Sequence, residues 1–71
     1  MRNKVEELRK GMGLSQEEFA RAIRVSRQTV SSIENGKYNP SLELAFVISH
    51  FFGKPIEGIF LYEGGEENEK K

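Results

Sequence analysis

Two helix-start signals lie eleven residues apart near the middle of the chain, and they constrain the fold more than any other feature. Ser15 is followed three residues later by Glu18, so the serine hydroxyl and the glutamate carboxylate can cap each other's backbone amides. Ser26 is a good N-cap for a second helix, which Asn35-Gly36 ends. The first helix is therefore short, and a turn of about three residues separates it from the second.

An earlier helix is predicted at the start of the chain. Asn3 followed by Glu6 is typical of a helix N-terminus, because the carboxylate lies near free backbone amides. Apolar residues follow at helical spacing, namely Val5, Leu8 and Met12. Gly11 and Gly13 are expected to end this helix.

A later helix is predicted after Pro40. Ser41 caps it and Gly53 ends it. Its inner stripe is expected to consist of Leu42, Ala45, Ile48, Ser49 and Phe52. Pro55 favours one more turn of helix. The apolar run over residues 59–62 has strand character, and it could pair within the subunit or with a second subunit.

These elements predict an all-α fold of four to five short helices, with tight connections and a short C-terminal strand as an option. The spacing of the two central helices is that of a helix-turn-helix, over about residues 15–35. A chain of 71 residues has room for one domain. We assign residues 1–62 to this domain and residues 63–71 to a disordered charged tail.

Composition excludes several classes of protein. The chain has no cysteine, which rules out disulfides, cysteine-based zinc sites and thiol catalysis. No stretch approaches the roughly 20 apolar residues that a membrane span needs. The charged N-terminus lacks the apolar region of a signal peptide, so a cytoplasmic location is expected. His50 is the single histidine and lacks clustered carboxylates, so we expect no metal and no cofactor.

The distribution of charge favours a binding protein with one basic end and one acidic end. The net charge is zero at pH 7, but residues 1–40 carry eight basic and five acidic side chains, whereas residues 41–71 carry three basic and six acidic ones. A basic half joined to an acidic half is compatible with a nucleic-acid partner for the first.

The helix that begins after Ser26 has two different faces. At 100° per residue, Val30, Ile33 and Glu34 cluster on one side. The opposite side carries short polar side chains, namely Gln28, Ser31, Ser32 and Asn35. A helix in the major groove of DNA needs donors and acceptors outward and a packed apolar back. Arg27 lies in the first turn, from which a long side chain can reach a base edge.

The sequence here resembles the phage repressor and Cro type of helix-turn-helix. The similarity covers about residues 4–62 and rests on three runs in combination: 14–20 (LSQEEFA), 25–30 (VSRQTV) and 33–36 (IENG). The chain is most similar to very short bacterial and archaeal regulators of that type. The resemblance implies a compact five-helix, lambda-repressor-like domain whose recognition helix spans about residues 26–35.

The resemblance and the helical face together give a set of expected DNA contacts. Base-reading side chains are expected to be Arg27, Gln28, Ser31 and Ser32. Contacts with the DNA backbone are expected from Gln16, Thr29, Asn35, Lys37, Tyr38 and Asn39. The resemblance also implies a structural ion pair between Arg9 and Glu34. This chain has Arg24 where the family's turn usually has glycine, so a left-handed backbone there would carry a cost.

A dimer is expected because one such domain covers only half of a two-fold operator. The predicted dimer surface is the apolar excess late in the chain: Leu44, Phe51, Ile56, Ile59, Phe60, Leu61 and Tyr62. The alternative is that these residues close the core of a single subunit.

The sequence therefore predicts a homodimeric transcriptional repressor that binds an inverted repeat in double-stranded DNA. A protein-interaction module that has lost DNA binding is the alternative, and the polar helix face argues against it. No glycine-rich phosphate loop or nucleophile–base set is present in the sequence, which disfavours an enzyme. No small-molecule ligand and no membrane partner are indicated.

Overall fold

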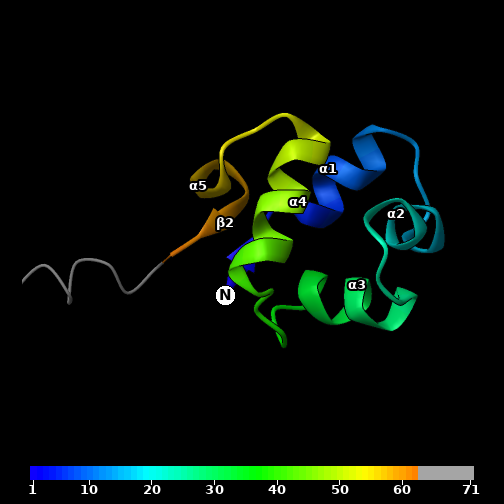
Figure 1. Ribbon diagram of the computed structural model, residues 1–71, viewed down its shortest axis with the longest axis horizontal. Coiled ribbons are helices and arrows are strands. Elements are labelled where there is room, and N and C mark those ends of the chain that lie inside the picture. Colours follow the sequence, from blue (N-terminus) through cyan, green and yellow to red (C-terminus); the bar gives the residue numbers. More distant parts are fainter. Residues whose placement is uncertain (63–71) are drawn as a thin grey trace, which may run out of the picture.

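The computed structural model describes residues 1–62, which form five helices and two short strands (Figure 1). The order along the chain is β1 (Arg2–Asn3), α1 (Val5–Gly11), α2 (Gln16–Ile23), α3 (Arg27–Glu34), α4 (Leu42–Phe52), α5 (Ile56–Ile59) and β2 (Phe60–Leu61). The predicted all-α fold of five helices is confirmed. The segment predicted to be a disordered charged tail, residues 63–71, lies outside the described residues.

Serine caps define the starts of the three longer helices, as predicted. The hydroxyls of Ser15, Ser26 and Ser41 accept hydrogen bonds from backbone amides three residues later. At α2 the capping box is complete, because Glu18 Oε1 also accepts from the Ser15 amide at 2.8 Å. The hydrogen bond from the Ser15 amide, followed by the effect of the nearby Ser15 hydroxyl, lowers the pKa of the Glu18 carboxyl.

The glycines predicted to end two of the helices do so in the left-handed conformation. Gly36 follows α3 with φ +76°, and Gly53 caps α4 with φ +66°. Side chains rarely adopt this backbone conformation, which explains glycine at both helix ends.

The helix start predicted at Asn3 lies two residues later in the structure. Helix α1 begins at Val5, and the side chain of its N-cap residue, Lys4, makes no capping bond. Asn3 instead lies in β1, where its Oδ1 accepts from the Val5 amide at 3.0 Å and its Nδ2 donates to the Ile33 carbonyl oxygen at 2.8 Å. A short amide side chain can satisfy backbone groups outside a helix equally well, and here it ties the N-terminus to the end of α3.

The strand predicted near the C-terminus pairs within the subunit. β1 and β2 are antiparallel, with Arg2 opposite Leu61 and Asn3 opposite Phe60. The Lys4 amide extends the pairing by donating to the Ile59 carbonyl oxygen at 2.8 Å. The two ends of the domain are thereby joined beside α5.

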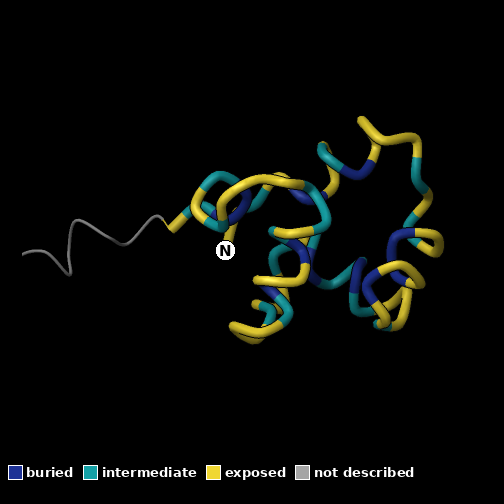
Figure 2. Tube along the Cα trace, turned by 45° about the horizontal axis from the view of Figure 1, so that its top comes forward, coloured by how far each residue is buried: buried dark blue, intermediate teal, exposed yellow. Residues whose placement is uncertain are grey.

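All five helices contribute to one core (Figure 2). Its buried apolar members are Val5, Phe19, Ala20, Ile23, Val30, Ile33, Ala45, Ile48, Ile59 and Phe60. Phe51 and Phe52 of α4 extend this core, with ring centroids 5.3 Å and 5.2 Å from that of Phe19. This aromatic cluster fixes α4 against α2.

Two residues predicted to face the core are exposed instead. Met12 is 53% exposed because α1 ends at Gly11, which removes Met12 from the helical stripe. Leu42 is 70% exposed because it is the first residue of α4, one turn before the first buried residue, Ala45. Hydrophobic spacing alone does not reveal where a helix leaves the core.

Candidate nucleic-acid interface

Helices α2 and α3 form the helix-turn-helix. Residues 24–26 separate them, and the Val25 amide donates to the Ala20 carbonyl oxygen at 2.9 Å to close the turn. Both helices bury their apolar faces in the common core, through Phe19, Ala20 and Ile23 from α2 and through Val30 and Ile33 from α3. The polar side of α3 is thus held outward on a rigid support.

Arg24 has a left-handed backbone conformation, so the energetic cost expected for a non-glycine residue at this turn applies. Its φ and ψ are 65° and 45°, and among the described residues it is the one non-glycine residue with positive φ. The residue caps the C-terminus of α2, and its amide donates to the Arg21 carbonyl oxygen. An L-residue in this region loses about 1–2 kcal/mol relative to its preferred conformation.

The outward side of α3 collects most of the residues expected to read bases. Arg27 and Gln28 are exposed, whereas Ser31 and Ser32 are half-buried. Gln28 and Ser32 share a surface hollow of about 270 Å³ with Ser26, Thr29 and Tyr38. The hydroxyls of Thr29 and Ser26 lie 2.9 Å apart, so Thr29 also supports the helix cap.

The loop after α3 brings the remaining expected DNA contacts beside the same helix. The amides of Lys37 and Tyr38 both donate to the Ser32 carbonyl oxygen, at 3.0 Å and 3.2 Å. The expected backbone contacts here are all exposed, namely Asn35, Lys37, Tyr38 and Asn39. Exposed polar side chains thus extend from the start of α3 to the loop, with a basic residue at each end, Arg27 and Lys37.

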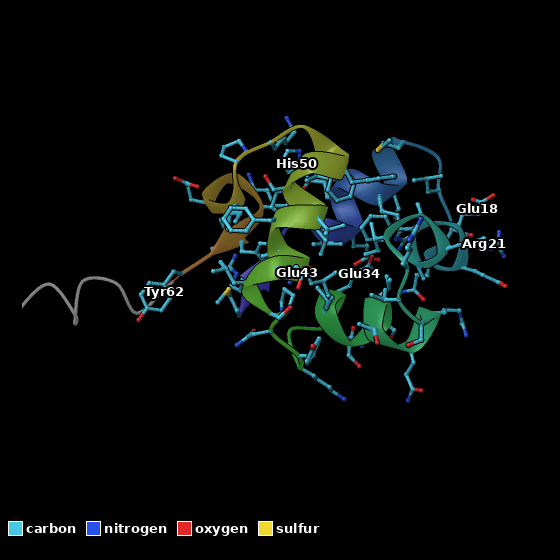
Figure 3. The ribbon with its side chains drawn as sticks, viewed as in Figure 1. Glu18, Arg21, Glu34, Glu43, His50 and Tyr62 are labelled. Carbon is cyan, nitrogen blue, oxygen red and sulfur yellow. The ribbon has the colours of Figure 1, made fainter. Side chains whose placement is uncertain are left out.

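Beneath this surface, Arg9 and Glu34 form the expected ion pair. Arg9 Nε lies 2.7 Å from Glu34 Oε2 and Nη2 lies 3.2 Å from Oε1, a bidentate geometry. Their side chains are only 7% and 3% exposed, and Glu34 points from α3 into the domain (Figure 3). The hydrogen bond to Glu34 raises the pKa of Arg9. Arg9 Nη1 also donates to the Leu14 carbonyl oxygen at 2.7 Å, which fixes the loop before α2.

Gln16 joins this buried pair. Its Nε2 donates to Glu34 Oε1 at 3.0 Å, so the first residue of α2 is tied to the last residue of α3. The sequence predicted a contact between Gln16 and DNA phosphate, and that remains a prediction. The bond between Gln16 and Glu34 could have been expected, because a buried carboxylate needs more than one hydrogen-bond donor.

No group of metal-ligating side chains competes with this surface in the part of the chain that the structure describes. No three histidine, cysteine or acidic side chains within residues 1–62 are grouped to hold a metal ion. None of the helices described is both long and apolar enough to cross a membrane.

Comparison of the sequence with known protein families agrees with this geometry. The helix-turn-helix family matches residues 5–59 of the chain. The chain belongs to this family. Its relatives include an uncharacterised transcriptional regulator of this type, MJ0272 of Methanocaldococcus jannaschii, which is 53% identical over 66 residues, covering 93% of this chain and 100% of that protein.

Two relatives of this helix-turn-helix regulator have names that state a direction of regulation. The transcriptional activator BcrR of Enterococcus faecalis is 39% identical over 64 residues, 90% of this chain and 30% of BcrR. The cryptic phage CTXphi transcriptional repressor RstR of Vibrio cholerae is 37% identical over 54 residues, 76% of this chain and 49% of RstR. The expected similarity to phage repressors is confirmed, and relatives of this kind are transcriptional regulators rather than enzymes.

The regulator does not expose all of the residues that the sequence assigned to a dimer surface. Ile59 is fully buried and Phe60 is 8% exposed, because α5 and the paired strands turn both side chains into the subunit's own core. Leu44, Phe51, Ile56 and Leu61 are half-buried, and Tyr62 is 64% exposed. Ile59 and Phe60 therefore have the structural role that the sequence analysis gave as the alternative.

Sequence reasoning missed the outward apolar residues of α4. Phe46 and Val47 are 50% and 40% exposed, and Leu42 lies on the same helix. The sequence did contain this information, because α4 carries large apolar residues beside its buried pair, Ala45 and Ile48, as well as at the buried positions.

Replacing Arg24 with glycine is expected to stabilise the domain. Glycine removes the cost of the left-handed conformation, about 1–2 kcal/mol. Part of this gain, about 0.4–1 kcal/mol, is lost because glycine increases the conformational entropy of the unfolded chain. Arg24→Ala is the matched control, because it removes the same side chain but keeps the strain. Urea denaturation should rank Arg24→Gly above both Arg24→Ala and the unmodified protein, and equal stability of the two variants would contradict this account.

Proposed function

We propose that this regulator binds a specific double-stranded DNA sequence as a homodimer, with α3 in the major groove of each half-site. The observation that carries the proposal is the division of α3. Val30 and Ile33 lock its inner side in the core, while Arg27 and Gln28 project into solvent. A rigid helix with exposed donors and acceptors suits base recognition in the major groove.

The two exposed side chains in the first turn fit different bases. The guanidinium of Arg27 can donate to both acceptors of guanine, and the amide of Gln28 can donate to and accept from adenine. Ser31 and Ser32 lie one turn further and have shorter reach. Lys37, Tyr38 and Asn39 follow in the loop, where contacts with phosphate would position the helix without reading sequence.

Repression is the direction of regulation that we favour. A domain this small can block a promoter by occupying it, and RstR is named a repressor, although BcrR is named an activator. Transcription from a promoter that overlaps the bound sequence should fall as the protein is added. Unchanged or increased transcription at saturating protein would contradict repression and leave DNA binding intact.

Selection of bound duplexes from a random pool tests the proposal directly. We expect the enriched sequences to contain an inverted repeat whose half-site centres lie about 10 base pairs apart, one turn of DNA. A variant with both Arg27 and Gln28 replaced by alanine should enrich no such repeat, and its thermal unfolding should match that of the unmodified protein. Failure of the unmodified, folded protein to enrich any sequence would favour the protein-interaction module instead.

A further inference from the structure

The last turn of α3 is bound by a side chain from the other end of the domain. Asn3 Nδ2 donates to the Ile33 carbonyl oxygen at 2.8 Å, and the Gly36 amide donates to the same oxygen at 3.0 Å. A carbonyl oxygen has two lone pairs, so these two donors satisfy it. We infer that Asn3 is a positioning residue for DNA binding, because it fixes the point at which α3 passes into the loop that is expected to contact phosphate. The inference rests on the proposed function and adds a residue that acts on the same interface.

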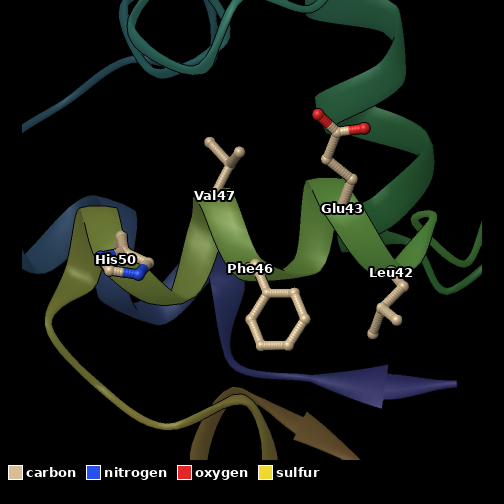
Figure 4. A pocket seen from close by; sticks show the side chains of 5 residues that line it. All are labelled: Leu42, Glu43, Phe46, Val47 and His50. Atoms are coloured by element: carbon tan, nitrogen blue, oxygen red, sulfur yellow. The ribbon is translucent and has the colours of Figure 1, made fainter.

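Asn3 is anchored to the core of the domain. Its backbone pairs with Phe60 in the two-stranded sheet, and the amide of the next residue, Lys4, donates to the Ile59 carbonyl oxygen at 2.8 Å. Ile59 is fully buried and Phe60 is 8% exposed. Both strands lie on the side of α4 toward which Phe46 points (Figure 4). The sheet therefore gives the Asn3 side chain a fixed place from which to hold α3.

The orientation of the Asn3 amide is also fixed. Its Oδ1 accepts from the Val5 amide at 3.0 Å, which leaves Nδ2 as the end of the side chain that faces Ile33. The backbone on either side of this bond is in close contact as well. A Cβ atom on Gly36 would lie 3.2 Å from the Met1 carbonyl oxygen. The N-terminal segment thus packs directly against the turn that follows α3.

The two ends of α3 are held by different means. The first turn, which carries Arg27, is held locally, because the Ser26 hydroxyl accepts from the Thr29 amide at 3.0 Å. The last turn depends on Asn3, which lies 30 residues from Ile33 in the sequence. Loss of the Asn3 bond should therefore release the loop and leave the base-reading end in place. Contacts with phosphate position a protein on DNA, whereas contacts with bases give it specificity.

Amide hydrogen exchange tests this bond without DNA. Asn3→Asp and Asn3→Ser both keep an oxygen acceptor at position 3 and remove the donor to Ile33. In both variants the loop amides should exchange about fivefold faster, the factor that corresponds to one lost hydrogen bond. These amides are those of Gly36, Lys37 and Tyr38, which donate to carbonyl oxygens of α3.

Ser49→Ala is the matched control for this measurement. It removes another side-chain bond to a carbonyl oxygen, that of Lys54, at the end of α4 remote from α3 (Figure 1). It should lower the stability of the domain and leave the exchange of the loop amides unchanged. Unchanged exchange in both Asn3 variants would overturn the inference, as would an equal acceleration in Ser49→Ala.

Binding titrations, well below the unfolding temperature of each variant, test the role of Asn3 in DNA binding. Asn3→Ser is suited to them because it leaves the net charge unchanged. It should weaken binding to every duplex by about fivefold, since binding must then order a loop that is no longer held. The base preference assigned to Arg27 should be unchanged, and Ser49→Ala should bind as the unmodified protein does. Full affinity in Asn3→Ser, or a changed base preference, would contradict the inference.

Combining Asn3→Ser with Lys37→Ala separates this inference from the proposed function. Because Asn3 acts through the loop, Lys37→Ala should cost less affinity in the Asn3→Ser background than in the unmodified protein. Losses that simply multiply would reject the role of Asn3 and leave the proposed function intact. An unmodified protein that binds no duplex would reject the proposed function, and with it the role of Asn3, even if the exchange measurement shows that the bond holds the loop.

Discussion

Arg9→Ala is expected to lower the free energy of unfolding by about 3–5 kcal/mol. Its guanidinium is bound by Glu34 on α3 and by the Leu14 carbonyl oxygen before α2. Removing it leaves Glu34, whose side chain is 3% exposed, with the Gln16 amide as its remaining side-chain donor among the described residues. A buried carboxylate that loses its counter-ion must be solvated or protonated, and either costs stability.

Urea denaturation measures this loss, and the chain provides a matched control. Lys10 is adjacent in sequence and pairs with Glu6 at 3.0 Å, but the two side chains are 64% and 54% exposed. Lys10→Ala should therefore cost no more than about 0.5 kcal/mol. The double variant Arg9→Met with Glu34→Leu should recover much of the stability that Arg9→Ala loses. A cost below about 1 kcal/mol for Arg9→Ala would show that the pair does not hold the three helices together.

Arg27→Ala is expected to weaken binding to the best selected duplex by about 1–3 kcal/mol and to relax the preference at one base position. The reason is that a guanidinium in the first turn of α3 can bind two acceptors of one base. Lys37→Ala is a useful comparison, because Lys37 lies in the loop and is expected to contact phosphate. It should weaken binding to all sequences alike and make the salt dependence less steep.

Binding titrations on the selected duplex and on duplexes altered at single positions measure both effects. Lys10→Ala again serves as the neutral control, since it removes an exposed charge from α1. A uniform loss of affinity over all duplexes in Arg27→Ala would move Arg27 to the residues that contact the DNA backbone. No loss at all would remove it from the interface.

Local capping chemistry made much of this structure predictable. The capping serines and the glycines after α3 and α4 satisfy backbone groups of their own segment, so their roles need no knowledge of the rest of the fold. The buried side of α3 could be predicted because apolar residues at helical spacing lie on a single face of the helix. The pairing of Arg9 with Glu34 came from the resemblance, since nothing local relates residues 25 positions apart.

The features that were missed depend on contacts between distant parts of the chain. Asn3 binds the carbonyl oxygen of Ile33 as well as the Val5 amide, and nothing in its local sequence indicated the long-range bond. Ile59 and Phe60 look like surplus apolar surface until the strand pairing turns them into the core. Leu42 lies on the correct helical stripe but beyond the edge of the core. Periodicity predicts the direction in which each side chain points, whereas its burial also depends on whether another part of the chain packs against it.

The central claim is that the outward side of α3 recognises a DNA sequence, and one measurement tests it most directly. The dissociation constant of the unmodified protein should be compared between the selected duplex and a scrambled duplex of equal length, at rising salt concentration. We expect the selected duplex to bind at least about 1,000-fold more tightly, and we expect both affinities to fall steeply with salt as counterions are released. Equal affinities for the two duplexes, or an affinity that does not change with salt, would contradict the account.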